Sequence, residues 1–180
     1  DATNTVTFDG GTGNASTRII ANNTSNSMDN VVLLDGADHI IFRNLTIRAT
    51  GSTYGIGVHL TNEADYNEIS DCVIEAPMST NSYAIGILGG SPTSNSSTGD
   101  FAEYNLIKNC TITGGYYGVR FNGQSSSGVQ AEGNRLHNNE VKDWYYYGVY
   151  MYYQRYTEVI DNEIIVRSNG SSSSYGLYLY

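Results

Sequence analysis

The hydrophobic and polar positions of the chain follow one short pattern that recurs. Six residues, here called the hexad, begin and end on an apolar side chain and carry Asn or Asp at the third place. The copies start between 23 and 38 residues apart, at 42–47, 69–74, 107–112, 136–141 and 159–164. Asn and Asp tolerate the left-handed backbone of a tight bend, so the hexad predicts two short strands joined by a corner. If the copies stack, their first and last places form two inward aliphatic columns.

A second apolar pattern alternates with the hexad. Each copy starts with Tyr followed by Gly or Ala, and then alternates apolar residues with others, as a half-buried strand does. These Tyr-Gly strands lie at 54–58, 83–87, 117–121, 147–151 and 175–179. Aligned on their Tyr, they predict two further inward columns, which are Ile56/Ile85/Val119/Val149/Leu177 and Val58/Ile87/Phe121/Met151/Leu179.

Strict alternation of two short elements at this spacing indicates a solenoid. The periods contain no helical pattern, which excludes helical repeats and βαβ units, and they are too short for the four strands of a propeller blade. We therefore predict an all-β fold, a parallel β-helix of about five to six coils that forms one domain over residues 1–180. Residues 1–30 would be an irregular first coil, and residues 31–180 the regular coils. Because the chain starts on Asp1 and stops within a strand, we expect it to be an uncapped piece of a longer protein.

Composition agrees with short strands and narrows the choice of partners. The 180 residues include 20 Gly and 16 Tyr but only 2 Pro, and 15% are charged. The net charge of −9 argues against binding to nucleic acid or to an anionic membrane. No apolar run reaches the roughly 18 residues of a membrane span. Ser, Asn and Gly collect in segments of variable length, which we expect to be projecting loops: 76–82, 89–100, 122–131 and 168–174.

The repeat resembles a known family. The pattern Asn-x-Ile-x-(Asn/Asp)-x-x-Ile at 67–74 and 105–112 is similar to the right-handed parallel β-helix repeat of pectate-lyase-like proteins. That resemblance covers about residues 31–180 and implies a right-handed coil. The segments 5–14 and 38–47 resemble the β-helix region of very large secreted proteins of Bacteroidetes-type bacteria, which usually carry a type 9 secretion tail. An extracellular or cell-surface location and this export route follow from the resemblance only.

The aromatic run at 144–156 is the main candidate binding site, with seven Tyr and one Trp in 13 residues. Strand alternation turns Tyr150 and Tyr152 outward, and Tyr178 and Tyr180 continue both columns in the next coil. Such an exposed, flat aromatic face suits a glycan or a protein partner. The alternatives are a tyrosine ladder that only stabilises the coils, or a face that packs against further coils of the longer chain. The candidate ligand-binding residues are Trp144, Tyr150, Tyr152, Tyr178, Tyr180 and Arg120.

A column of acids lies four residues before the hexads. Its members are Asp38, Asp65, Glu103 and Glu132, and Arg155 takes the last place. Stacked carboxylates repel one another, so they need water, a cation or an arginine. A Ca²⁺ ion between coils is one solution. We favour solvated acids closed by Arg155, and therefore expect no metal and no cofactor.

Two cysteines share the fourth hexad place. Cys72 and Cys110 should be stacked neighbours about 5 Å apart, which is within disulfide range. In-register parallel neighbours point the same way, which suits the disulfide dihedral poorly. We predict two buried free thiols and no disulfide.

The outward places of the Tyr-Gly strands show no constellation for catalysis. They hold Gly57, His59, Gly86, Leu88, Arg120, Asn122, Tyr150 and Tyr152, without a carboxylate pair for acid–base chemistry. In this alignment His59 and Arg120 lie two coils apart and in different columns. We predict no catalytic residue and no enzyme in this segment.

The expected function is that of a structural and adhesive module of a large secreted or cell-surface bacterial protein. Its partners would be a glycan or a surface protein, together with the rest of its own chain. The alternative is a carbohydrate-active enzyme, similar to a polysaccharide lyase or hydrolase, whose active site lies outside this fragment.

Overall fold

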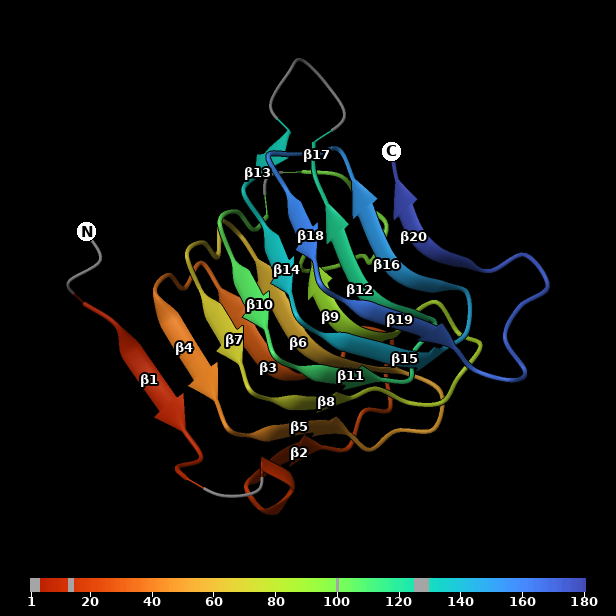
Figure 1. Ribbon diagram of the computed structural model, residues 1–180, viewed down its shortest axis with the longest axis horizontal. Coiled ribbons are helices and arrows are strands. Elements are labelled where there is room, and N and C mark those ends of the chain that lie inside the picture. The colour runs from red at the N-terminus through yellow and green to blue at the C-terminus, as the bar shows by residue number, and fades with distance from the viewer. Residues whose placement is uncertain (1–3, 13–14, 100, 125–129) are drawn as a thin grey trace.

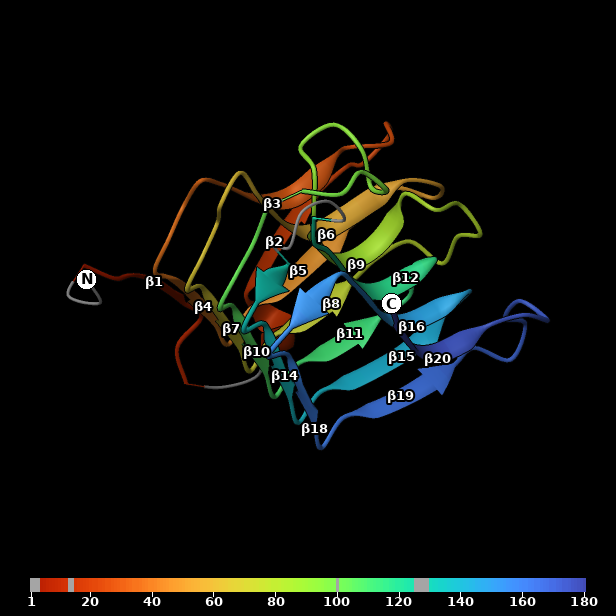
Figure 2. The same ribbon diagram turned by 90° about the horizontal axis from the view of Figure 1, so that it is seen from above.

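The chain folds as a right-handed parallel β-helix of about six coils, as the repeat predicts (Figure 1). The computed structural model describes residues 4–12, 15–99, 101–124 and 130–180. Three six-stranded parallel sheets, here called A, B and C, each take one strand from every coil. In a second view the strands of sheet A follow one another in chain order from β1 to β18 (Figure 2). Among the described residues the one helix is a short 3₁₀ turn, η1 (Ala15–Thr17).

The strands are short, and their bounds show the regularity of the coil. Sheet A contains β1 (Val6–Asp9), β4 (Ile40–Arg43), β7 (Glu68–Ser70), β10 (Leu106–Lys108), β14 (Arg135–His137) and β18 (Glu158–Ile160). Sheet B contains β2 (Ile19–Asn22), β5 (Thr46–Ala49), β8 (Val73–Glu75), β11 (Thr111–Thr113), β15 (Glu140–Trp144) and β19 (Glu163–Val166). Sheet C contains β3 (Asn30–Asp35), β6 (Gly55–Thr61), β9 (Ala84–Gly89), β12 (Tyr117–Asn122), β16 (Tyr147–Tyr152) and β20 (Tyr175–Leu179). A fourth, two-stranded sheet pairs β13 (Ala131–Glu132) with β17 (Gln154–Arg155).

The hexad forms the corner between sheets A and B. Its third residue has a left-handed backbone in all copies, with φ between 53° and 57° at Asn44, Asp71, Asn109, Asn138 and Asp161. The side chains of this column also bond to one another, for example from Asn138 Nδ2 to Asn109 Oδ1 at 2.8 Å. The predicted bend is therefore present, and a polar ladder runs along it.

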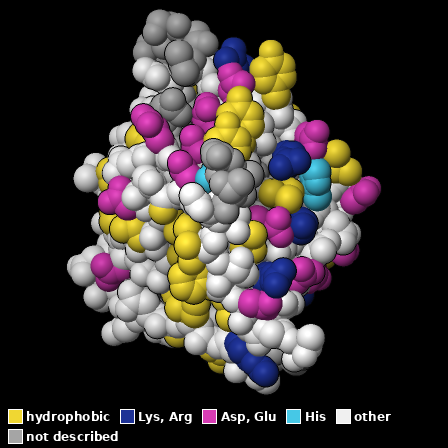
Figure 3. Space-filling model, turned by 90° about the vertical axis from the view of Figure 1, so that its left-hand side faces the viewer, with side chains coloured by type: hydrophobic (Ala, Val, Ile, Leu, Met, Phe, Trp, Pro, Cys, Tyr) yellow, Lys and Arg dark blue, Asp and Glu magenta, His cyan; other side chains and the backbone are white. Residues whose placement is uncertain are grey.

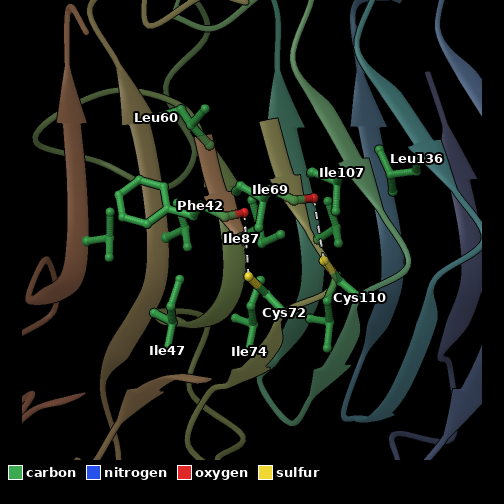
Figure 4. Close-up of a cluster of buried hydrophobic side chains, with 14 of the residues drawn as sticks. Phe42, Ile47, Leu60, Ile69, Cys72, Ile74, Ile87, Ile107, Cys110 and Leu136 are labelled. Carbon is green, nitrogen blue, oxygen red and sulfur yellow. Dashed lines mark hydrogen bonds between the residues drawn. The ribbon is translucent and has the colours of Figure 1, made fainter. Parts of the chain in front are cut away.

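The core consists of stacked aliphatic columns, and the two columns predicted from the hexad ends are confirmed. Ile47, Ile74, Ile112 and Val141 pair in register from coil to coil and are fully buried. The column that starts at Phe42 lies opposite them (Figure 4). At the first coil the apolar members are half exposed, and apolar side chains appear among scattered charges on that side of the molecule (Figure 3).

The alignment of the Tyr-Gly strands is wrong by two residues for the first two copies. Ile85 of β9 pairs with Tyr117 of β12, and Ile87 pairs with Val119. The equivalent glycines are therefore Gly86 and Gly118, and a Cβ on Gly118 would lie 2.4 Å from a methyl carbon of Val141. The true repeat reads Ile-Gly or Tyr-Gly, because only glycine leaves room at this place for sheet B.

A second asparagine ladder lies inside the corner before sheet A. The backbone N–H of Asn67 donates to Asn105 Oδ1 at 2.9 Å, and that of Asn105 donates to Asn134 Oδ1 at 3.1 Å. The amides of Asn105 and Asn134 donate in turn to the carbonyls of Ala64 and Ala102. All three asparagines are buried, so the ladder satisfies backbone groups that water does not reach.

We expected the loop at 89–99 to project from the coil, but it does not. Asn122 Nδ2 donates to the carbonyl of Asn95 at 2.9 Å, and Gly99 N donates to the carbonyl of Gly123. Asn95 and Ser91 are themselves buried. The loop therefore folds back over part of the outer side of sheet C.

Candidate functional site

The outer side of sheet C carries a cluster of tyrosines over its last coils. We call this cluster the tyrosine face, and it consists of Tyr117, Tyr147, Tyr150, Tyr152, Tyr175, Tyr178 and Tyr180. Strand register places Tyr150 beside Tyr178, and Tyr147 between Tyr117 and Tyr175. The glycine that follows each of Tyr117, Tyr147 and Tyr175 packs against sheet B. Because side chains alternate along a strand, these three tyrosines point to the outer side.

The rings of the tyrosine face stack on one another from coil to coil. Tyr150 and Tyr178 lie 5.0 Å apart between ring centroids with planes 2° from parallel, and Tyr152 and Tyr180 lie 4.9 Å apart. Each such pair contributes about 0.5–1.5 kcal/mol beyond area burial. Because one face of Tyr150 meets Tyr178 and the other meets Arg120, the surface presents ring edges and hydroxyl groups. The flat platform that we expected is therefore covered at Tyr150, whereas Tyr175 and Tyr180 of the last coil remain 44% and 65% exposed.

Three hydroxyls of the tyrosine face, on Tyr117, Tyr147 and Tyr150, have a raised pKa. Burial raises the pKa of Tyr117 to about 12, although the Arg120 guanidinium opposes this shift. Burial also raises the pKa of Tyr147 and of Tyr150. At neutral pH these three hydroxyls are therefore uncharged groups that both donate and accept hydrogen bonds.

Arg120 lies within this face and is only 5% exposed. Its Cζ atom is 4.5 Å from the ring centroid of Tyr117 and 4.8 Å from that of Tyr150, and these two rings stand at 75° to each other. Its Nε atom donates to Asn122 Oδ1 at 2.9 Å. No carboxylate in the described part of the chain pairs with it.

Trp144, which we expected among the ligand-binding residues, belongs to the core. Its side chain is 3% exposed and packs in the main hydrophobic cluster. The register of β15 against β19 shifts between Lys142 and Trp144, and Asp143 has a left-handed φ of 59°. This irregularity at Asp143 accompanies the inward turn of Trp144.

His59 and Arg120 share one outward column, which corrects the separate columns of the sequence alignment. Leu88 lies between them in the strand register. His59 is fully buried beneath the 89–99 loop, where its Nε2 atom lies 3.3 Å from the carbonyl of Gly90. Its Nδ1 atom has no hydrogen-bond partner among the described residues, and burial lowers the pKa of its ring.

The acid column binds backbone groups. The N–H of Asp65 donates to Asp38 Oδ1 at 2.8 Å, that of Glu103 to Asp65 Oδ1 at 2.7 Å, and that of Glu132 to Glu103 Oε1 at 3.0 Å. Arg155 donates to Glu132 and closes the column. Across the described residues, no group of three or more His, Cys, Asp or Glu side chains is arranged to hold a metal ion.

An aromatic stack beside the acid column was missed in the sequence. The ring centroids of His39 and Tyr66 lie 5.3 Å apart, and those of Tyr66 and Tyr104 lie 5.0 Å apart with planes 4° from parallel. All three residues have left-handed φ angles. The available signal was an aromatic residue three places before each of the first three hexads.

The two cysteines are buried and free. Their Sγ atoms donate to the carbonyls of Ser70 and Lys108, each at 3.2 Å. A hydrogen bond with Cys72 and burial both raise the pKa of the Cys110 thiol. The pair packs within the main core, as Figure 4 shows.

Comparison with known proteins found no relative of this chain. Within the described residues, no helix is long and apolar enough to cross a membrane. A scan against protein-family models, a search of curated proteins and a search of solved structures each gave no significant match.

Proposed function

We propose that this chain is a structural and adhesive β-helix module of a large secreted or cell-surface bacterial protein, and that its tyrosine face binds glycans. The observation that carries the proposal is the regular array of uncharged hydroxyls on a rigid sheet. The resemblance of segments 5–14 and 38–47 to secreted β-helix regions supports the extracellular setting.

Glycans are favoured over nucleic acid or lipid by the chemistry of this face. Its stacked rings leave edges and hydroxyls at the surface, and neighbouring rows lie about one strand spacing apart. Tyr residues with an apolar body and a polar tip are suited to surfaces that are partly wet. The net charge of −9 disfavours anionic polymers. Sugars offer many hydroxyls that can pair with such rows.

The test is binding to a glycan array by the chain and by a variant that loses hydroxyls only. The triple substitution Tyr150→Phe, Tyr152→Phe and Tyr178→Phe keeps the ring stacks, so the fold should survive. We expect its affinity for the retained glycans to fall at least about tenfold, since each lost hydrogen bond contributes roughly 0.5–1.5 kcal/mol.

Tyr66→Phe is the matched control, because it removes a hydroxyl from an aromatic stack on another corner of the coil. It should bind as the unmodified chain does. Equal binding by the triple variant, or no glycan retained by the unmodified chain, would refute the proposal. Hydrolysis or β-elimination of pectin or alginate by the chain would overturn its non-enzymatic part.

A further inference from the structure

Arg120 is a buried cation whose charge no described residue neutralises. Its Nε atom is bound to Asn122, but no described group accepts a hydrogen bond from its two Nη atoms. The residue as a whole is 5% exposed, and neither Nη atom is fully buried. The guanidinium therefore packs against the rings of Tyr117 and Tyr150, which stand at 75° to each other.

An arrangement of this kind stabilises the cation only in part. Removing an ionised group from water is unfavourable unless the group is paired. The two cation–π contacts offset only part of this cost. The planar fork remains free for the group it matches best, a carboxylate bound through two parallel N–H···O bonds.

The surroundings of Arg120 limit how many anions can bind. The strands of sheet C carry one other charged side chain, Asp35 of β3, which lies on the far side of β6 and β9. Toward the last coil the neighbours are the uncharged tyrosines of β16 and β20. With a net charge of −9 on the chain, a polyanion would be repelled beyond its first charge.

We infer that the tyrosine face selects glycans in which one sugar bears a carboxylate and its neighbours are neutral. The carboxylate binds the Nη atoms of Arg120 over β12, and the neutral sugars lie along the hydroxyl rows over β16 and β20. This inference rests on the proposed glycan binding and specifies that the bound glycan carries one negative charge.

The experiment uses sugar pairs that differ by one acid, namely cellobiose with cellobiouronic acid and lactose with sialyllactose. Titration calorimetry on the full chain should show the acidic member of at least one pair binding about tenfold or more tightly. The preference should shrink as salt is raised. Hexagalacturonate, the polyanionic probe, should bind no more tightly than the preferred single acid.

Arg120→Gln should remove the preference for the acid while sparing most of the affinity for the neutral member. Arg120→Lys keeps the charge but loses the planar fork, so it should retain only part of the preference. Arg135→Gln is the matched control, since it removes one positive charge from an exposed place on sheet A. Circular dichroism and a thermal melt establish that each variant is folded.

The outcomes separate this inference from the proposal beneath it. Equal binding of acidic and neutral members, or a preference that persists in Arg120→Gln, overturns the inference and leaves glycan binding intact. Tighter binding of hexagalacturonate overturns the limit to one charge. Binding of no sugar, together with an empty glycan array, removes the proposed function and this inference with it. If Arg120→Gln is unfolded, a full acid preference in Arg120→Lys overturns the role of the fork.

Discussion

At the scale of single residues, His59 shows how burial on the outer side of a sheet changes a side chain. The ring lies between Leu33 and Leu88 and under Gly90 and Ser91 of the loop. The nearest charge that acts on it is Asp35, which favours the protonated ring, but burial outweighs this effect and lowers the pKa from 6.5. The folded chain therefore holds His59 neutral at pH values where the unfolded chain protonates it.

The sign of the pH effect follows from this lowered pKa. The contribution of His59 to stability is complete above pH 6.5 and is lost as the pH falls through the folded pKa. The melting temperature should therefore drop between about pH 7 and pH 5. His59→Leu, which continues the apolar column, should flatten that drop. His137→Gln, which removes a partly exposed imidazole beside Glu158 on sheet A, should keep the part of the drop that His59 causes. An unchanged slope in His59→Leu would show that another group causes it.

Single residues also mark where sequence reasoning succeeded and where it failed. The left-handed bend at Asn44 and its counterparts followed from residue type, because Asn and Asp are the side chains that adopt it at low cost. Trp144 could not be placed in the same way. Its direction depends on a register shift at Asp143, and nothing in the local pattern of apolar residues signals that shift.

At the scale of elements, the buried asparagine ladder closes the corner before sheet A. Asn105 accepts a bond from Asn67 N and donates to the carbonyl of Ala64. Asn105→Ala would leave both backbone groups buried without a partner, at a cost of about 1–3 kcal/mol for each. We expect the free energy of unfolding to fall by roughly 2–6 kcal/mol in urea denaturation.

The outer ladder supplies the control. Asn109 bonds to Asp71 and Asn138 at an exposed corner, and its φ of 54° is open to glycine. Asn109→Gly should therefore cost under about 1 kcal/mol. Similar losses for the two variants would mean that burial of the ladder does not set its contribution.

Elements were predictable where the pattern has one solution. The hexad has a polar residue at a fixed place between two apolar ends, so its register is unambiguous. The strands of sheet C contain two glycines in the first copy, Gly55 and Gly57, and alignment on Tyr54 chose the wrong one. Which glycine occupies the equivalent place depends on the space that Val141 and its neighbours in sheet B leave, and this space cannot be read from the sequence. This choice also concealed the shared column of His59 and Arg120.

At the scale of the whole molecule, each coil contacts only its neighbours, so stability should depend on position along the axis. One column tests this, because Ile112 and Ile164 share a residue type and a direction but differ in place. Ile112 has neighbours on both sides and is fully buried, whereas Ile164 of the last described coil is only partly buried. The apolar ladders were predictable from the sequence. The decrease in burial from Ile112 to Ile164 could be seen only once the stacking order of the coils was known.

Ile112→Ala should cost about 2–5 kcal/mol in urea denaturation, because it opens a cavity that two coils enclose. Ile164→Ala should cost well under half of that, since water fills the space on its open side and fewer contacts are lost. Hydrogen exchange should agree, with amides of β11 protected more strongly than those of β19. Equal costs in the two variants would contradict the dependence of stability on position along the axis.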